Sequence, residues 1–135
     1  MKIQAVSLFL LPNIKIITMG FLDNAREKLK ETAKKEVDTL LITGESIEKF
    51  YMVKEDYCAL TNKRLLFIDK SFASSRKAST GIPFSKINSV SLKKGGAFSI
   101  SKEVIVTVGS KDLEIDLWDA NEALEIFKAI SERIV

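Results

Sequence analysis

At 135 residues, of which 46% are hydrophobic and 29% charged, the chain has the length and composition of one soluble globular domain. It contains no histidine and a single cysteine, Cys58, which excludes a histidine–cysteine zinc site, a serine–histidine–aspartate triad, a cysteine–histidine pair and an intrachain disulfide. We expect no catalytic residues and no cofactor. Asp112, Glu114 and Asp116 share one face of a predicted strand, but a straight strand spreads its carboxylates apart, so we expect a solvent-facing or partner-facing acidic strip and no metal. We also expect a cytoplasmic location, in keeping with a reducing compartment, with membrane association as the alternative.

Charge is distributed unevenly along the chain, although the formal net charge is only +3. Residues 61–102 contain nine basic residues and one acidic residue, whereas residues 103–135 contain eight acidic and three basic residues. This asymmetry suits an anionic ligand, or a contact between the basic surface of one copy and the acidic surface of the next; the alternative is ordinary solvated charge. We expect no nucleic-acid partner, because Phe67 and Phe84 in the basic segment fit a core better than an exposed stacking surface.

Residues 1–18 are an apolar N-terminal extension that does not fit a targeting segment. The apolar run between Lys2 and Lys15 is interrupted by polar residues and Pro12, is too short to span a bilayer and precedes no cleavage pattern. Met19 reads as a natural start, so a misassigned start codon is one explanation of the segment. If it is translated, its apolar side chains need cover from the domain or from another copy.

Residues 19–41 have the apolar spacing of an amphipathic helix with mixed charge on its other face. A helix that packs on the domain or on a neighbouring subunit is favoured over one that lies on a membrane surface, because its charge is not strongly cationic. We expect its apolar stripe to form an oligomer interface. The stripe consists of Leu22, Ala25, Leu29, Ala33 and Val37.

Residues 42–135 have the pattern of one β-rich domain. We expect seven short strands, at residues 46–54, 56–61, 64–69, 77–84, 87–93, 103–109 and 112–118. Turn residues separate them, and consecutive short strands indicate a meander that closes as a barrel or a sandwich. Asp119 then begins a final helix that should pack on the open mouth of the sheet. Its predicted core residues are Ala123, Leu124, Phe127, Ile130 and Ile134.

The polar residues Thr61-Asn62-Lys63-Arg64 lie between two apolar runs, which indicates a hairpin turn. We expect Lys63 and Arg64 to point to solvent or to a neighbouring subunit. The whole stretch LTNKRLLFID resembles the second and third strands of bacterial pleckstrin-homology-like (PH-like) domains. Further agreement comes from Thr43-Gly44-Glu45, from residues 81–87, from residues 96–99 and from the final helix.

The resemblance covers about residues 20–135 and implies a mainly β fold with α elements. The implied fold is a PH-like barrel of seven antiparallel strands in two packed sheets, capped by a C-terminal helix and preceded by an N-terminal helix. The family is largely of unknown function, and some members form ring-like homo-oligomers, so self-association is implied. Eukaryotic PH domains that bind phosphoinositides carry a basic cluster across their first two strands. This chain departs from that pattern, with only Lys49 and Lys54 there among acidic residues.

Basic residues in three loops are the candidate site for an anion or a partner. In a PH-like meander these loops share one end of the barrel, which would suit a phosphate, an acidic lipid head group or an acidic peptide. Ordinary solvated loop charge is the alternative. Phe72, at a predicted loop tip, either inserts into a membrane or partner or folds back over the core. The candidate residues are Lys54, Lys70, Phe72, Arg76, Lys77 and Lys111.

These observations favour a non-enzymatic PH-like module for binding and self-assembly, with an unknown protein partner. The alternative is a peripheral membrane module that binds anionic lipid head groups through the basic mouth of the barrel.

Overall fold

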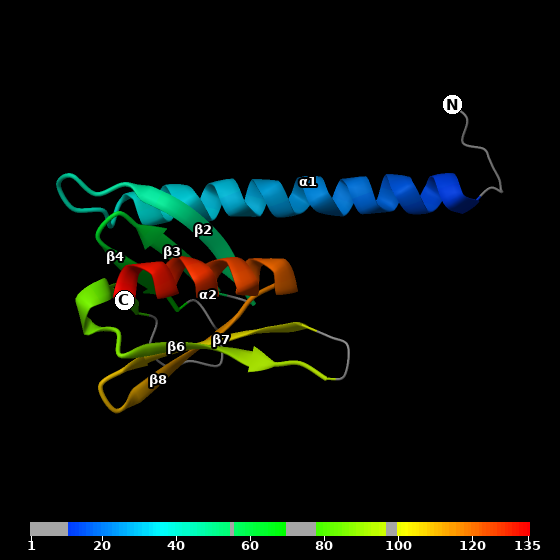
Figure 1. The fold of residues 1–135 in the computed structure, drawn as a ribbon. Helices are drawn as coiled ribbons and strands as arrows, with labels where there is room; N and C mark the ends of the chain where they lie inside the picture. The colour runs from blue at the N-terminus through cyan, green and yellow to red at the C-terminus, as the bar shows by residue number, and fades with distance from the viewer. Residues whose placement is uncertain (1–10, 55, 70–77, 97–99) are drawn as a thin grey trace. The chain divides into compact units, whose positions relative to one another are not determined.

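The structure, a computed structural model, describes residues 11–54, 56–69, 78–96 and 100–135. The chain divides into two compact units, a helical unit that ends at Thr39 and a β unit that comprises Leu40–Val135. The division falls two residues before the predicted boundary at residue 41. Helix α1 belongs to the first unit, and two sheets and helix α2 belong to the second (Figure 1).

Helix α1 comprises Leu11–Asp38, so it begins well before the predicted start at residue 19. The prediction assigned residues 1–18, with Pro12 among them, to an extension that precedes the helix. A proline is tolerated in the first turn, however, where its missing N–H would have no partner within the helix. Residues 11–18 are therefore helical, and the 28 residues of α1 extend over about 42 Å at 1.5 Å per residue.

The apolar stripe of α1 is only partly buried. Ala33 and Val37 have relative exposures of 1% and 0%, whereas Leu22 and Leu29 are 55% and 56% exposed, and Ala25 is also exposed. The stripe thus has a buried C-terminal half and an exposed N-terminal half.

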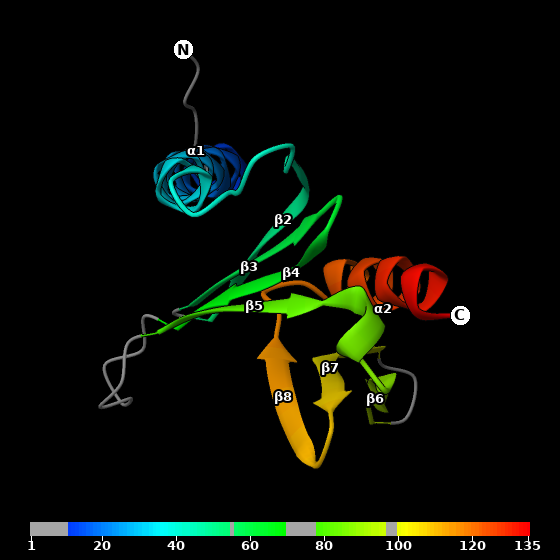
Figure 2. The same ribbon diagram turned by 90° about the vertical axis from the view of Figure 1, so that its left-hand side faces the viewer.

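The β unit contains the seven predicted strands in two antiparallel sheets, which confirms the expected fold. The four-stranded sheet has the order β2 (Ile47–Val53), β3 (Asp56–Thr61), β4 (Arg64–Ile68) and β5 (Ser79–Pro83). A short 3₁₀ helix, η1 (Phe84–Lys86), leads into the three-stranded sheet of β6 (Ser89–Lys94), β7 (Ile100–Val108) and β8 (Lys111–Asp116). Figure 2 shows the two sheets meeting at a steep angle.

The core lies between the two sheets and consists of residues that alternate along the strands. Tyr51, Leu60 and Leu65 of the four-stranded sheet share one cluster of buried residues with Val104 and Ile115 of the three-stranded sheet. Fully burying each of these aliphatic side chains contributes roughly 1.5–3 kcal/mol to folding.

Asp119, the predicted capping residue, directly precedes helix α2 (Ala120–Ile134). The Asp119 carboxylate accepts a hydrogen bond from the Asn121 N–H (3.3 Å), which satisfies one of the N–H groups that lack a partner within the helix. The middle of α2 is joined to β2, because the Tyr51 hydroxyl donates a hydrogen bond of 2.7 Å to the Glu125 carboxylate. The cap and this bond fix where α2 lies over the core.

The buried face of α2 is turned slightly from the prediction. Ala123, Ile126 and Ile130 are buried in the core, whereas the predicted core residues Leu124, Phe127 and Ile134 are partly buried. At 3.6 residues per turn, the first three share one narrow face and Phe127 lies on its border, whereas Leu124 lies about 100° round the helix from Ala123.

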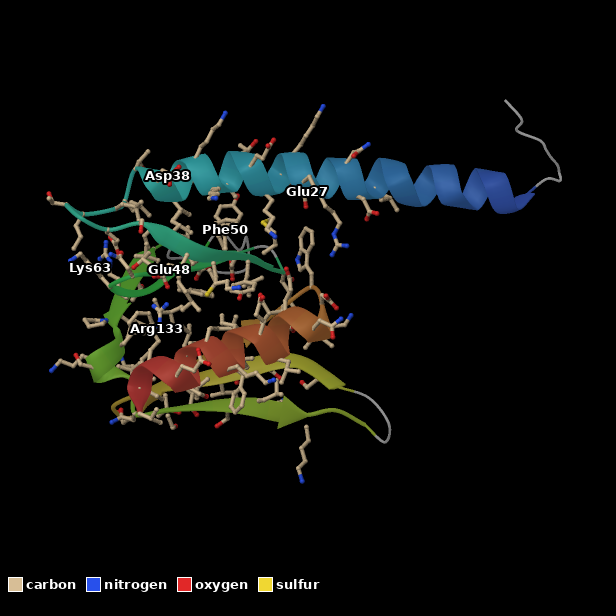
Figure 3. The ribbon with its side chains drawn as sticks, turned by 45° about the horizontal axis from the view of Figure 1, so that its top comes forward. Glu27, Asp38, Glu48, Phe50, Lys63 and Arg133 are labelled. Carbon is tan, nitrogen blue, oxygen red and sulfur yellow. The ribbon has the colours of Figure 1, made fainter. Side chains whose placement is uncertain are left out.

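The C-terminal turn of α2 is fixed by Arg133. Its guanidinium donates a hydrogen bond to the Thr61 carbonyl (2.8 Å), forms an ion pair with Glu48 of β2 and lies 5.0 Å from the ring centroid of Phe84. Figure 3 shows Arg133 extending from α2 toward Glu48. One side chain thus connects α2 to β2, to the β3–β4 hairpin and to η1.

Candidate functional site

The predicted hairpin turn joins β3 to β4, and its polar side chains bind the segment that leads into β2. The Asn62 side chain accepts a hydrogen bond from the Ser46 N–H (2.9 Å) and donates one to the Gly44 carbonyl (3.0 Å). The Thr61 hydroxyl accepts hydrogen bonds from the N–H groups of Lys63 (3.0 Å) and Arg64 (2.9 Å). These bonds explain the polar residues by local structure, without a ligand.

Arg64 corrects the prediction that both basic residues of this turn point to solvent or to a neighbour. Lys63 is exposed, as Figure 3 shows, but the Arg64 Nε and Nη2 donate hydrogen bonds of 2.9 and 3.0 Å to the two carboxylate oxygens of Glu45. Nη2 also donates to the Leu40 carbonyl (3.1 Å). The sequence did not reveal this pair, because Glu45 and Arg64 are 19 residues apart and meet only once the sheet forms.

The Glu45 side chain is fully buried, and its charge is stabilised by these donors. The hydrogen bonds from Arg64 lower the pKa of Glu45 from 4.5 to about 2, and bonds from the Thr61 hydroxyl and the Ile42 N–H act in the same direction, while burial opposes them. A carboxylate this well satisfied has no free acceptor for a substrate proton. We therefore assign the Glu45–Arg64 pair a structural role.

The predicted basic site is not assembled among the described residues. Lys54, in the β2–β3 turn, forms an ion pair with Asp116 at the end of β8 (2.8 Å), whereas Lys111 begins β8. The five residue steps between positions 111 and 116 correspond to about 17 Å of strand, so Lys54 and Lys111 do not converge. The other candidates, Lys70, Phe72, Arg76 and Lys77, lie outside the described residues.

Lys111 does belong to a pocket, which lies where β5 and β8 approach each other from different sheets. The pocket has a volume of about 300 Å³ and a mostly apolar lining. Figure 2 shows β5 of the four-stranded sheet near β8 of the three-stranded sheet. The pocket could not be predicted from sequence, because Thr80 and Ile82 are about 30 positions from Lys111 and Leu113. Its lining consists of Phe67, Thr80, Ile82, Val108, Lys111, Asp112 and Leu113.

The described residues bear on metal binding, membrane insertion and thiol chemistry. Among them, no three histidine, cysteine, aspartate or glutamate side chains gather as metal ligands, and no helix is long and apolar enough to cross a membrane. Cys58 is buried, and burial raises the pKa of its thiol. An apolar pocket and an exposed apolar stripe are two candidate features for function among the described residues.

Comparison with known proteins agrees with this fold. The family described as bacterial PH domain matches residues 16–134. Two uncharacterized proteins of Bacillus subtilis are similar: YozO, 26% identical over 78% of this chain and 92% of its own length, and YjqA, 27% identical over 70% and 80%.

Two crystal structures have a similar fold. One is a DUF1696 family protein with a pleckstrin-homology domain from Shewanella loihica, with a TM-score of 0.61 and 22% identity over 78% of this chain and 93% of that one. The other is a pleckstrin homology domain from Shewanella amazonensis, with a TM-score of 0.62 and 21% identity over 78% and 88%.

Proposed function

The chain belongs to the bacterial PH domain family, and we propose that it is a non-enzymatic module that binds copies of itself and a protein partner. The proposal is that the N-terminal half of the α1 stripe forms the contact between copies. Leu22 and Leu29, each more than half exposed in the single chain, are the observation that carries it.

Exposed apolar residues at helical spacing favour a protein contact, because burying each leucine would contribute roughly 1.5–3 kcal/mol. An amphipathic helix also gains most of its stability from packing its apolar face. A second copy offers an identical stripe, and two such stripes can pair about a two-fold axis or repeat head to tail around a ring. If the basic surface of one copy met the acidic surface of the next, the contact would be head to tail and would favour the ring.

Charge pairing between copies is the weaker part of the proposal. Lys93 of the basic segment forms an ion pair with Glu103 of the acidic segment within one chain (2.9 Å). Asp116 of the acidic segment is likewise paired within the chain, with Lys54. These charges already have partners, so we expect apolar contacts to contribute more to assembly than charge pairs.

Membrane binding through a basic barrel mouth receives no comparable support. It requires several converging cations, but the described candidates Lys54 and Lys111 lie at opposite ends of β8. Flotation with anionic and neutral vesicles tests it: binding that depends on anionic lipid would replace the protein-contact proposal as the main function.

Sedimentation velocity of a double variant tests the role of the stripe. Leu22→Glu with Leu29→Glu adds two negative charges to the exposed half and should reduce the assembly to monomer. Asn24→Glu with Lys35→Gln changes the net charge equally on the opposite, exposed face and should leave the assembly intact. Assemblies of equal size in both variants would show that the stripe is not the contact.

A further inference from the structure

Strand β5 is an edge strand of the four-stranded sheet. It pairs with β4 on one side, and within the described residues no strand pairs with its other side. Natural edge strands are commonly guarded by charged side chains, because their unpaired backbone groups accept another strand. β5 contains only Ser79, Thr80, Gly81, Ile82 and Pro83, and all but Ile82 are exposed. Its edge therefore carries no charged side chain, and only Pro83, at its end, lacks a backbone N–H.

The pocket beside β5 adds a place for a side chain. Thr80 and Ile82 of β5 line it together with Phe67, Val108 and Leu113. Its volume of about 300 Å³ is at the lower limit for sites that enclose a small molecule, and its lining is mostly apolar. One large apolar side chain anchored on a peptide backbone suits these dimensions better than a drug-sized ligand does.

Charge at the rim of the pocket favours a peptide that has an acidic residue near the apolar residue that fills the pocket. Lys111 lines the pocket, is exposed and has no ion-pair partner in the part of the chain that the structure describes. Asp112, also on the rim, has its Oδ1 engaged by the Thr107 hydroxyl at 2.7 Å. This bond leaves the negative charge of Asp112 in place, but side chains alternate along a strand, so Lys111 lies on the same face of β8 as Leu113 and Asp112 lies on the other face. On the face of Leu113, the cation offered to a ligand is therefore Lys111.

From these three features we infer that the β5–β8 groove binds an extended peptide segment of a partner protein. The segment adds to the free edge of β5 as a strand, fills the pocket with one large apolar side chain and places a carboxylate beside Lys111. The backbone pairing would supply affinity, and the pocket and the lysine would supply selectivity. The inference rests on the proposed function, because it identifies how a protein partner is recognised.

Hydrogen exchange tests the backbone pairing. The probe is a pool of seven-residue peptides of threonine and valine, with leucine, isoleucine, phenylalanine, methionine or tryptophan at the centre and glutamate two positions later. Exchange of β5 amides is followed by NMR at millimolar peptide. We expect slower exchange at β5 and unchanged exchange at β2, the other edge of the same sheet. No protection at β5 from any peptide in the pool would overturn the inference.

Two neighbouring residues of β5 provide matched variants for the pocket. Thr80 lines the pocket, and Ser79 faces the other side of the sheet, since side chains alternate along a strand. Thr80→Trp should fill the pocket and weaken binding of the best peptide about tenfold or more, whereas Ser79→Trp should leave binding unchanged. Equal effects from both variants would contradict the proposed use of the pocket.

A charge reversal tests the rim. Lys111→Glu should weaken binding of the acidic peptide about three- to fivefold, as expected for an exposed ion pair, while the exposed control Lys86→Glu should not. A peptide with lysine in place of glutamate should show the opposite preference for Lys111→Glu. If both peptides bind both proteins equally, the charge argument is wrong.

The same samples separate this inference from the proposed self-association. Light scattering reports the mass of the assembly without peptide, so the peptide experiment can fail while self-association holds. Protection of β5 that grows with protein concentration in the absence of peptide would assign the groove to a second copy and overturn the choice of a partner peptide.

Discussion

Arg64→Ala should destabilise the β unit strongly, because it leaves the Glu45 carboxylate buried without its main donors. Glu45 would lose two hydrogen bonds, and the Leu40 carbonyl would lose one. The Glu45 side chain is fully buried, whereas that of Arg64 is 23% exposed. The carboxylate is thus the group whose desolvation would no longer be compensated.

The expected cost is about 3 kcal/mol in the free energy of unfolding. Removing one partner of a buried ion pair costs about 3–5 kcal/mol, and water that enters the space left by the partly exposed Arg64 keeps the value at the lower end. The pKa gives an upper limit for the loss at Glu45: a carboxyl lowered from 4.5 to about 2 contributes about 3 kcal/mol at neutral pH, at about 1.4 kcal/mol per unit, and part of this comes from Thr61 and Ile42, which the variant keeps.

Urea unfolding as a function of pH measures both effects. Because the pKa of Glu45 is lower in the folded state, its contribution is fully present above about pH 5 and is lost as the pH falls toward 2. Arg64→Ala should therefore reduce stability at neutral pH and flatten its decline over this acidic range. Lys86→Ala, at an exposed site, should change stability by less than about 0.5 kcal/mol.

A loss below about 1 kcal/mol, together with an unchanged acid decline, would refute the structural role of the pair. A double-mutant cycle with Glu45→Gln gives an independent check, since two residues in direct contact should show a coupling energy of at least about 0.5 kcal/mol.

Three further predictions concern the β unit. Gly81→Ala should destabilise by displacing Arg64, because an added Cβ would lie 2.5 Å from its Nη1; in an Arg64→Ala background, thermal unfolding should show most of this cost removed. Tyr51→Phe removes the hydrogen bond to Glu125 and should cost about 1.5–3 kcal/mol in urea unfolding, whereas a cost near zero would contradict its importance. Cys58 should not react with a thiol reagent until the β unit unfolds, and rapid reaction of the native protein would argue against its burial.

Much of the β unit could be predicted from sequence because its signals are local. Apolar alternation and turn residues located the strands to within about three residues at each end, and Asp119 marked the start of α2. The resemblance of LTNKRLLFID to PH-like strands supplied the two-sheet arrangement, which local patterns left open between barrel and sandwich. Strand positions are encoded within a few residues, whereas the choice between related sheet architectures is not.

The candidate site was less predictable because it depends on contacts between distant residues. Arg64 reads as a solvated loop charge until β2 and β4 bring Glu45 beside it. Lys54 lies in one predicted turn and Lys111 follows another, and only the folded sheets place Lys54 beside Asp116, at the opposite end of β8 from Lys111. The pocket at β5 and β8 arises from the angle between two sheets, which no local pattern records.

The mass of the wild-type protein in solution tests the proposed self-association most directly. Light scattering should be measured over a dilution series, at about 0.1 M and about 1 M salt, because the higher concentration screens charge beyond about 3 Å. We predict a mass that is a multiple of 15.1 kDa at both salt concentrations, since apolar contacts through the α1 stripe should persist when charges are screened. A mass of 15.1 kDa at every protein and salt concentration would contradict the proposal.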